Sequence, residues 1–592
     1  MSKLFSRRDL DFLLNDLLDV GALCERPRYA MHDRQVFGAV LDQAFALAED
    51  VYLPFAARLD AEEPSFDGER VRTIPELPAA IEAYVEAGFP AMGFPEDMGG
   101  MQLPFTVATL AGLVFTAANA PAQNYAFLAA GAANLLCAFG SQEQKALYAR
   151  PLIEGRWFGT MALSEPQAGS SLADVKTRAV PNGDGTYDLA GSKIWISGAE
   201  HELRENIVNL VLARLPDAPP GVKGISLFIV PKFIPDAEGR PGERNGIRLV
   251  GLNRKLGQRG TTNCVLALGA DEPCTGFLVG EPHKGLTYMF HMMNEARIGV
   301  GAAAATLACR GYLESLAYAK ERLQGRPLSG KDPNAPPVPI VEHPDVKRML
   351  LAQKAIAEGA LHLCLYGARL VDEIAVTEDP AVRADLELLL EVLTPVIKTW
   401  PSEKGCEANS LAIQVHGGYG YTHDFPVERL YRDQRLNPIH EGTTGVQGLD
   451  LLGRKVRMAE GRGLLLLGRR IAETVAAARA VPELAAQAGE LEAAVARLAA
   501  LTPGLLTEAA RNPERGLGNA TLYLMATGTI VVGWLWLQQA LKAAPHAAED
   551  PFFAGKLAAC RYFFRYETPQ ARAWMETLEA LDDVLLTPTE AL

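Results

Sequence analysis

The sequence predicts an α+β protein of several domains, because its 592 residues exceed what one hydrophobic core accommodates and its pattern changes along the chain. Both ends of the chain carry long segments with broad apolar faces, which are typical of packed helices. Between them, residues 157–285 carry short β-branched or alternating runs separated by Gly, Pro, Asn and Asp. Such runs at close intervals are the pattern of a small all-β domain.

The predicted domain order is helical, β, helical and helical. Residues 1–155 are expected to form an N-terminal helical domain, and residues 156–285 a middle β domain. Long helical segments do not interleave these strands, which argues against a parallel βαβ sheet. The helical pattern returns over residues 286–459, where a Pro-rich loop at 329–346 interrupts it. Residues 460–592 are rich in Ala and Leu and predict an additional helical domain.

Composition limits the classes of partner. Hydrophobic residues make up 48% of the chain and charged residues 22%, as in ordinary globular proteins. The formal net charge is −14 and no Lys/Arg run forms a basic patch, so we expect no nucleic acid partner. The eight cysteines are scattered, without CxxC or zinc-ligand spacing. They predict reduced core residues, a cytoplasmic location and no metal site.

Two segments bear on membrane association. The N-terminal twenty residues are interrupted by charges and predict an amphipathic helix rather than a secretion signal. Residues 516–541 contain no charged side chain and are long enough to span a bilayer. Thr, Asn and Gln interrupt their apolar character, which favours a buried helix. We therefore expect no stable membrane insertion.

One segment matches a dinucleotide-binding fingerprint in its residue types but not in its predicted secondary structure. Gly299-Val-Gly301-Ala-Ala-Ala304 fits the GxGxxA pattern, which requires a strand before it and a helix that begins at it. Here the residues lie inside a helical segment, where small side chains let helices pack closely. We therefore expect no Rossmann-type NAD site.

Three segments stand out as candidates for chemistry. Residues 161–170 (MALSEPQAGS) run from a strand into a turn whose N–H groups and hydroxyls suit a flavin edge or a pyrophosphate. Residues 191–197 (GSKIWIS) place a Trp before a small hydroxyl residue. The third segment combines residues 414–421 (QVHGGYGY) with residues 439–447 (IHEGTTGVQ). Taken singly, each has an ordinary explanation: a strand-to-loop turn, a core Trp and a solvated Glu.

Together these segments resemble the acyl-CoA dehydrogenase family. Residues 164–170 match its Thr/Ser-Glu-Pro-x-x-Gly-Ser pattern, and residues 193–197 match Lys-x-Trp-Ile-Thr/Ser. Residues 414–420 match Gln-x-x-Gly-Gly-x-Gly, and residues 440–443 match Tyr-Glu-Gly-Thr except at the first position, which is His440. Four motifs in this order are far more specific than any one of them.

The resemblance covers about residues 40–455 and implies a fold. The family has an N-terminal helical domain, a middle antiparallel β-barrel-like domain and a C-terminal four-helix-bundle domain. The extra C-terminal helical domain resembles the long subclass of the family. Residues 201–233 are most similar to the bacterial 3-methylmercaptopropionyl-CoA dehydrogenase type.

The resemblance implies FAD as the cofactor. Residues at the Met161, Leu163 and Ser164 positions contact the flavin ring, and those at Trp195 and Ser197 cover it and bond its edge. An Arg at the Arg322 position contacts FAD phosphates, although Gly325 and Arg326 depart from the motif that follows. The expected cofactor contacts are Met161, Leu163, Ser164, Ser170, Trp195, Ile196, Ser197, Arg322, Gln414, Gly417, Gly418, Thr443 and Thr444.

The resemblance makes Glu441 the base that removes the substrate's α-proton. Some family members place the base at the position of Ala296, which cannot accept a proton here. The expected substrate contacts are Ser170, Asn294, Arg297 and Gly442, with Arg297 at the CoA end. His440 has three open roles: a bond to the thioester region, titration near neutral pH, and packing.

The implied function is FAD-dependent α,β-dehydrogenation of an acyl-CoA to a trans-2-enoyl-CoA in fatty acid β-oxidation. The loop from Gln414 to Gly418 reaches the FAD of a neighbouring subunit in the family, which implies a homodimer or larger assembly. An electron-transfer flavoprotein is the expected electron acceptor. Two alternatives are an acyl-CoA oxidase and a non-catalytic binding or assembly protein. Intact Glu441 and the acidic charge argue against the non-catalytic alternative.

Overall fold

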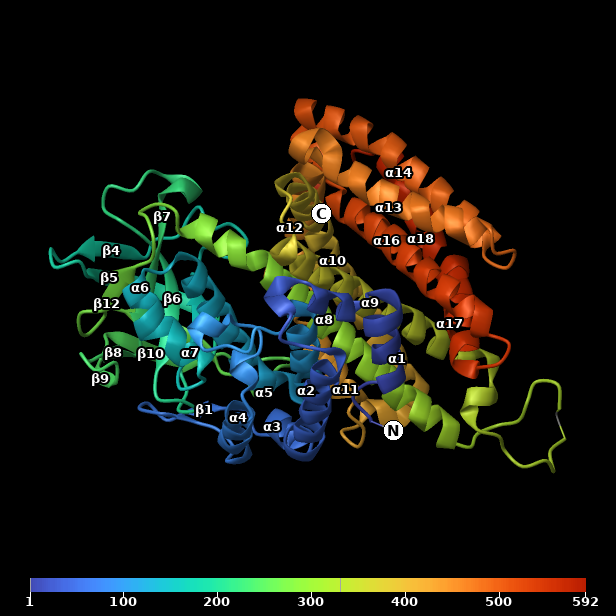
Figure 1. Ribbon diagram of the computed structural model, residues 1–592, viewed down its shortest axis with the longest axis horizontal. Helices are drawn as coiled ribbons and strands as arrows, with labels where there is room; N and C mark the ends of the chain where they lie inside the picture. The colour runs from blue at the N-terminus through green and yellow to red at the C-terminus, as the bar shows by residue number, and fades with distance from the viewer. Residues whose placement is uncertain (1, 331, 592) are drawn as a thin grey trace. The chain divides into compact units, whose positions relative to one another are not determined.

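The computed structural model describes residues 2–330 and 332–591, except for the side chains of residues 290–293. The chain forms two compact units, whose elements are labelled in Figure 1. One unit comprises His32–Ala296 and contains all the strands, so we call it the β unit. The other, the helical unit, comprises the chain up to Met31 together with Arg297–Leu592. The predicted division into four domains at 155, 285 and 459 stays a prediction.

The helical part of the β unit centres on one long apolar helix. Asn119 leaves helical backbone geometry inside α5, two residues before Pro121, because proline supplies no N–H to the helix and clashes with the preceding turn. Most of the side chains around this kink are buried. The helices of the unit are α2 (Arg34–Leu47), α3 (Ala56–Ala61), α4 (Glu76–Glu86), α5 (Phe105–Phe139), α6 (Gln142–Gln144) and α7 (Arg150–Ile153).

The predicted β region contains an eight-stranded sheet. Its strand order is β10-β11-β5-β12-β7-β6-β3, and β4 pairs with both β5 and β6. The strands are β3 (Phe158–Ala162), β4 (Arg178–Pro181), β5 (Tyr187–Ser197), β6 (Ile207–Arg214), β7 (Ile225–Pro231), β10 (Ile247–Leu252), β11 (Asn263–Leu268) and β12 (Thr275–Leu278). Two short hairpins stand apart from it, β1 (Ser65–Phe66) with β2 (Val71–Arg72) and β8 (Phe233–Pro235) with β9 (Pro241–Arg244).

The sheet closes on itself, as the barrel-like prediction requires, but it is not wholly antiparallel. Strands β5, β12, β7, β6 and β4 form a ring of pairings. Within the sheet, β3 runs parallel to β6 along its whole length, and β4 is parallel to β6 at one residue pair. The parallel pairing is possible because a long connection separates β3 from β6 along the chain. Both β6 and β7 are buried on both faces, which explains their continuous apolar runs.

The helical unit is built from long helices that pack along one another. Helices α9 and α10 contact each other over much of their length, and α16 packs against α9, α10, α12, α13 and α14. The Pro-rich loop predicted at 329–346 separates α8 from α9. The helices are α1 (Arg7–Asp11), α8 (Gly285–Glu321, which begins in the β unit), α9 (Pro344–Val376), α10 (Pro380–His416), α11 (Val427–Gln434), α12 (Thr444–Gly453), α13 (Arg462–Arg479), α14 (Ala485–Arg511), α15 (Pro513–Leu517), α16 (Ala520–Ala543), α17 (Pro551–Tyr562) and α18 (Thr568–Ala580).

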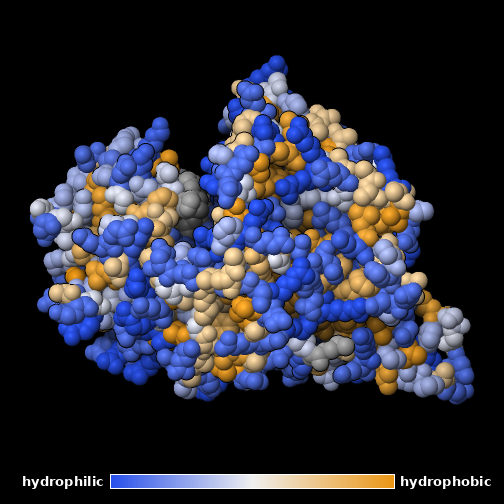
Figure 2. Space-filling view, viewed as in Figure 1, coloured by the Kyte–Doolittle hydropathy of each residue, from blue (hydrophilic) through white to orange (hydrophobic). Residues whose placement is uncertain are grey.

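The uncharged segment at 516–541 forms helix α16, as predicted. Two helical segments are long and apolar enough to cross a membrane, Pro513–His546 and also Phe105–Phe139, which the sequence analysis did not single out. Within the protein, 89% of the first apolar window and 72% of the second are buried. Figure 2 shows hydrophilic residues across one face of the protein, with apolar residues in separate groups between them. Burial by other helices explains the apolar character of α16 without a membrane.

The N-terminal segment packs within the helical unit. Its predicted amphipathic helix is confirmed as α1 and the helical segment η1 (Phe12–Leu17), whose apolar side chains are buried. Phe12 makes edge-to-face contacts with Phe552 and Phe553 of α17. The Lys556 ammonium, also on α17, forms a buried salt bridge of 2.6 Å with Asp9. These contacts explain why this segment belongs with the helices at the far end of the sequence.

The GxGxxA match lies inside helix α8, so the rejection of a Rossmann site is confirmed. Gly301 is where α8 meets the backbone of α10. A Cβ atom added at Gly301 would lie 2.0 Å from the carbonyl oxygen of Ile397. The glycine therefore serves close packing of two helices and not phosphate binding.

We predict that Gly301→Ala lowers the free energy of unfolding by about 1 to 3 kcal/mol, because the backbones of α8 and α10 must separate to admit the methyl group. The thermal unfolding midpoint measures the change. Gly468→Ala on α13 is the matched control, since no atom lies within 4 Å of its added Cβ. We expect the control to be neutral or slightly stabilising. Equal midpoints for the two variants would contradict the packing role of Gly301.

Candidate active site

The β unit brings together two of the predicted segments. Residue Ser164 follows strand β3, and its carbonyl oxygen accepts a hydrogen bond of 3.0 Å from the Ile194 amide on β5. The Lys193 ammonium donates to the Leu163 carbonyl oxygen at 3.0 Å. Met161, Leu163 and Ser164 are all half-buried. The motif at 161–170 therefore lies directly beside the motif at 193–197.

A buried ion pair fixes the turn after β3. Lys193 is fully buried, and its ammonium lies 2.9 Å from the Glu165 carboxylate. The same carboxylate accepts hydrogen bonds from the Thr177 hydroxyl at 2.6 Å and the Lys176 amide at 2.7 Å. Burial raises the pKa of Glu165, but the Lys193 charge and these hydrogen bonds outweigh it and hold that pKa below its ordinary range. Glu165 is therefore an ionised group with a structural role, and its carboxylate oxygens are occupied by these contacts.

Trp195 is exposed because of an irregularity in its strand. Along β5, Lys193 pairs with Leu266 but Ile196 pairs with Cys264, so two residues of β5 oppose one of β11. This is a β-bulge, and Trp195 within it has a left-handed backbone with φ of 64°. The bulge breaks the alternation that would bury Trp195 with Lys193, and its side chain is 61% exposed. A large aromatic held outward in a strained conformation is consistent with the predicted cofactor contact of Trp195.

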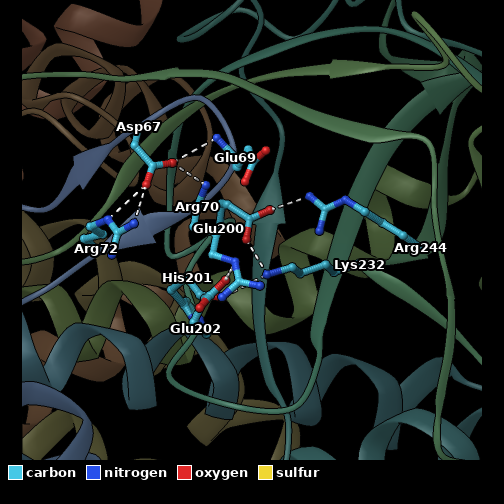
Figure 3. Close-up of polar contacts among 9 residues, drawn as sticks. All are labelled: Asp67, Glu69, Arg70, Arg72, Glu200, His201, Glu202, Lys232 and Arg244. Atoms are coloured by element: carbon cyan, nitrogen blue, oxygen red, sulfur yellow. Dashed lines mark hydrogen bonds and ion pairs between the residues drawn. The ribbon is translucent and has the colours of Figure 1, made fainter.

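The chain on both sides of this bulge is anchored. The Ser197 hydroxyl accepts a hydrogen bond of 3.2 Å from the Asn263 amide, and the Ser197 carbonyl accepts one of 2.6 Å from Thr160. Just beyond the strand, the Glu200 carboxylate binds the Lys232 ammonium and, at 3.1 Å, the Arg244 guanidinium (Figure 3). The exposed Trp195 is thus presented from a rigid frame.

In the helical unit, Glu441 occupies a tight turn before helix α12. Its φ is 53° and that of Gly442 is 94°, so two successive residues adopt the left-handed conformation. Thr443 follows as the N-cap of α12, and its side chain accepts a hydrogen bond from the Val446 amide. The Thr444 hydroxyl donates to the Glu403 carboxylate. This places the predicted base and its neighbours at one end of one helix.

Two buried side chains hold this turn through its carbonyl oxygens. The Lys398 ammonium, from α10, donates to the Gly442 carbonyl at 2.6 Å, and the Gln447 amide donates to the Glu441 carbonyl at 3.1 Å. Both side chains are fully buried. A Cβ atom on Gly442 would lie 2.4 Å from Gln447 Nε2, which explains the glycine. Neither Lys398 nor Gln447 was predicted from the sequence as a site residue. A Lys inside the apolar run at 396–400 (VIKTW) could have indicated a buried ammonium with a specific partner.

The Glu441 carboxylate is poised between opposing effects. Its side chain is half-buried. Desolvation raises the pKa of Glu441, while the charges of Lys398 and Arg297 lower it. Desolvation is the larger effect, so the pKa of Glu441 lies above its ordinary value. Among the described residues, no hydrogen bond or salt bridge engages this carboxylate. Burial also lowers the pKa of His440 to about 4, so His440 is neutral at physiological pH and does not titrate near neutrality.

The predicted substrate contacts occupy different surroundings. Arg297 is buried on α8 and forms a salt bridge of 2.9 Å with Asp450 of α12. Its charge acts on Glu441, the predicted base, and its expected role at the CoA end stays a prediction. Asn294 is half-buried in the part of α8 that belongs to the β unit, and Ser170 is exposed after the turn that Glu165 fixes.

A third set of predicted residues lines an open cavity of about 500 Å³ in the helical unit. Arg322 lies on one side, after the end of α8, and Gly417 and Gly418 lie on the other, after α10. Gln414 is exposed on the last turn of α10. His416 stacks on Tyr318 with ring centroids 4.4 Å apart and lines the same cavity. The structure therefore brings together Arg322 and the Gly417–Gly418 turn, which are far apart in sequence.

Within each unit, one set of these residues fits a part of a flavin dinucleotide by its chemistry. The exposed Trp195, with the Ser197 and Ser164 hydroxyls nearby along the paired segments, suits a ring with polar edges. The Arg322 guanidinium and a turn without Cβ atoms suit phosphate groups, since added Cβ atoms at Gly417 and Gly418 would have open space within 4 Å.

Comparisons with known proteins identify the family along almost the whole chain. Family models match as the acyl-CoA dehydrogenase N-terminal domain over residues 38–156, the middle domain over 160–269 and the C-terminal domain over 283–456. A further model, described as acetyl-CoA dehydrogenase C-terminal like, matches residues 467–588.

Curated relatives and solved structures agree with these matches. The chain is 38% identical to 3-methylmercaptopropionyl-CoA dehydrogenase of Ruegeria pomeroyi, with 93% of each chain covered. It is 35% identical to the broad-specificity linear acyl-CoA dehydrogenase FadE5 of Mycobacterium tuberculosis, with 99% of this chain and 98% of the relative covered. An acyl-CoA dehydrogenase of Bacillus anthracis, solved with FAD, has the same fold at a TM-score of 0.74 and 23% identity, with 97% of this chain and 93% of that chain covered.

The predicted helical–β–helical order with an additional helical region is thus confirmed, and so is the resemblance on which the cofactor was predicted. The chain belongs to the acyl-CoA dehydrogenase family, the FAD-dependent oxidoreductases that dehydrogenate acyl-CoA thioesters.

Proposed function

We propose that Glu441 is the general base that removes the α-proton of the bound acyl-CoA. The observation that carries this proposal is a half-buried carboxylate with a raised pKa and no committed partner among the described residues, held on a left-handed turn. A base with a pKa nearer neutrality accepts a proton more effectively at physiological pH. The position also matches the family motif at residues 440–443.

The chain's own residues then direct the proton and the developing charge. The α-proton moves to a carboxylate oxygen of Glu441, while hydrogen bonds to the thioester oxygen stabilise the enolate character that forms. We propose the backbone N–H of Glu441 as one such donor, with Gly442 allowing the substrate to approach closely. FAD, when bound, would supply the acceptor for the hydride that leaves the β-carbon, so that the product would be a trans-2-enoyl-CoA.

We propose that the cofactor contacts come from the residues named above. Trp195, Ile196 and Ser197, with Met161, Leu163 and Ser164, would hold the flavin ring; Thr443 and Thr444 are further contacts, and Ser170 would meet both cofactor and substrate. Arg322, Gln414, Gly417 and Gly418 would hold the phosphate-bearing end of an FAD that a second subunit shares. Asn294 and Arg297 would position the CoA thioester. The supporting observation is that residues distant in sequence meet in two of these sets, Ser164 with Ile194 and Arg322 with the Gly417–Gly418 turn.

The family resemblance also suggests a location, an assembly state and an electron acceptor. We propose a cytoplasmic homodimer or larger assembly that acts in fatty acid β-oxidation and passes electrons to an electron-transfer flavoprotein. The support for such an acceptor is the family resemblance, since the family models match residues 38–156, 160–269 and 283–456. Dioxygen as the acceptor, as in an oxidase, would instead release hydrogen peroxide during turnover.

We predict that Glu441→Gln lowers the rate of anaerobic flavin reduction by acyl-CoA by on the order of 10² to 10⁴, because Gln keeps the size but cannot accept the proton. Stopped-flow absorbance measures this rate. The panel of substrates includes 3-methylmercaptopropionyl-CoA and linear acyl-CoAs, which the relatives' names suggest. FAD content and substrate affinity are expected to stay unchanged.

The matched control for this variant is Glu295→Gln. Glu295 is the nearest carboxylate in sequence to Arg297 on α8, and it accepts a hydrogen bond of 3.1 Å from Asn134. We expect the control to reduce flavin within a few-fold of the parent rate. If Glu295→Gln is inactive while Glu441→Gln is not, the base has been assigned to the wrong residue.

We predict that Trp195→Ala weakens FAD binding several-fold, since the exposed indole would lose its contact with the flavin ring. Flavin absorbance after extensive dialysis, followed by titration of the apoprotein with FAD, measures the affinity. Leu256→Ala is the control, because Leu256 is a large apolar side chain of the same unit that is 62% exposed. Equal FAD affinity in both variants would argue against the placement of Trp195 over the flavin.

We predict that light scattering on the FAD-loaded protein gives at least twice the chain mass of 63.8 kDa. The physical reason is that Arg322 and the Gly417–Gly418 turn line an open cavity, which a cofactor shared with a second subunit would fill. A monomer that carries one FAD per chain would contradict the shared site.

A further inference from the structure

Lys398 is a buried cation that the proposed reaction does not yet use. It lies in the middle of α10 and its side chain is fully buried. Unlike Lys404, which is also buried on α10 and forms a salt bridge of 2.7 Å with Glu567, its ammonium donates to a backbone carbonyl, that of Gly442. A buried ammonium is costly unless it serves a purpose or a partner.

The position of this ammonium is tied to the base. Gly442 directly follows Glu441, and both residues have the left-handed conformation. Left-handed backbone costs energy for a non-glycine residue such as Glu441, so the surrounding contacts must hold it. Lys398 and Gln447 supply these contacts at successive carbonyl oxygens. Lys398 therefore fixes the turn on which the carboxylate is presented.

The same ammonium also lies close enough to act on the carboxylate through its charge. The charged groups that act on Glu441 are Lys398 from α10 and Arg297 from α8. The Arg297 charge is largely compensated by its salt bridge with Asp450, and the nearby Glu403 carboxylate accepts the hydroxyl of Thr444. His440, next to Glu441, is neutral at physiological pH because burial lowers its pKa to about 4. The Glu403 charge also acts on Lys398, but among the described residues Lys398 forms no salt bridge, whereas Arg297 does.

We propose that Lys398 is a positioning residue for the dehydrogenation: it pins the turn that carries Glu441 and keeps the carboxylate ionised, and therefore ready to accept the α-proton. This inference rests on the proposed role of Glu441 as the base. Lys398 acts through Glu441 and transfers no proton itself. Its hydrogen bond to the Gly442 carbonyl leaves the carboxylate oxygens available for the substrate.

The proposal fixes the sign of a pH effect. The base works when it is deprotonated, so the rate rises with pH through the pKa of Glu441. A nearby cation lowers that pKa, and loss of the cation therefore shifts the acid limb of the profile to higher pH. Burial lowers the pKa of Lys398 itself to about 8. Lys398 is charged in the parent below that pH, so the shift of the acid limb is measured below about pH 8.

The test measures the proton step alone in the FAD-loaded protein. The probe is a 3-thia-acyl-CoA, in which sulfur replaces the β-carbon, so the thioester can lose its α-proton but has no β-hydride to transfer. Incorporation of deuterium at the α-carbon from deuterium oxide is followed by mass spectrometry across pH values on both sides of neutrality. The variants are Lys398→Met, which removes the charge, and Lys398→Arg, which keeps it.

Lys398→Met is expected to move the acid limb upward by on the order of one pH unit. Because this variant also loses the hydrogen bond to the Gly442 carbonyl, its rate should stay below that of the parent at pH values above the limb. Lys398→Arg should restore the parent's acid limb, at a reduced rate if the longer side chain disturbs the turn. Gln447→Met removes the other hydrogen bond to the turn without changing charge, so it should lower the rate at all pH values and leave the limb in place. Lys404→Met, the matched loss of a buried ammonium on α10, should also leave the limb in place.

Two outcomes would overturn the proposed role of Lys398, and a third would overturn the assignment of Glu441 as the base. An unshifted acid limb in Lys398→Met shows that Lys398 does not tune the base, and the same shift in Gln447→Met shows that any disturbance of the turn produces it. If Lys398→Met does not fold, Lys398→Gln takes its place, because it also removes the charge and should shift the acid limb in the same direction. Exchange that persists in Glu441→Gln would instead reject Glu441 as the base.

Discussion

The active end of the helical unit depends on one constraint, the left-handed turn at Glu441 and Gly442. This backbone is unfavourable for a glutamate, and it persists because Lys398 and Gln447, both fully buried, bind its two carbonyl oxygens. The turn ends where Thr443 caps α12. The direction of the Glu441 side chain is therefore set by α10 and α12 together, and any change that moves one helix against the other moves the proposed base.

The additional C-terminal helices support those same two helices. Helix α16 packs against both α10 and α12. Two residues after Lys398, the Trp400 indole donates a hydrogen bond of 3.1 Å to Thr529 of α16, and Gly528 leaves room for that indole. On α12, a Cβ atom at Gly448 would meet the backbone of Ala520 and Thr521 at 2.8 Å. Helix α16, which is long and apolar enough to span a membrane, thus packs against the two helices that position the proposed base.

Sequence reasoning went furthest where the chemistry is local. Alternating runs predicted the β region, and four motifs predicted the segments around Ser164, Trp195, Gly417 and Glu441, because a motif records which residues must lie near each other along the chain. It failed where the structure depends on which strands pair with each other and in which register. The parallel pairing of β3 with β6 depends on a long connection, and the bulge that turns Trp195 outward depends on the register against β11. Lys398 was missed because a lone lysine in an apolar helix gives no indication of which carbonyl it meets.

Two of the buried Glu and Lys combinations in this chain show that the same pair of residue types can serve two different purposes. In the β unit, Lys193 binds the Glu165 carboxylate directly at 2.9 Å, and further hydrogen bonds hold the pKa of Glu165 below its ordinary range. That carboxylate is a poor proton acceptor, because its pKa is low and its oxygens already bind Lys193, Thr177 and the Lys176 amide. At the proposed base, Lys398 binds a neighbouring carbonyl, so its charge reaches the Glu441 carboxylate only through space. Desolvation then still raises the pKa of Glu441, while its oxygens remain available. The difference between a structural acid and a proton acceptor is thus the atom to which the lysine donates.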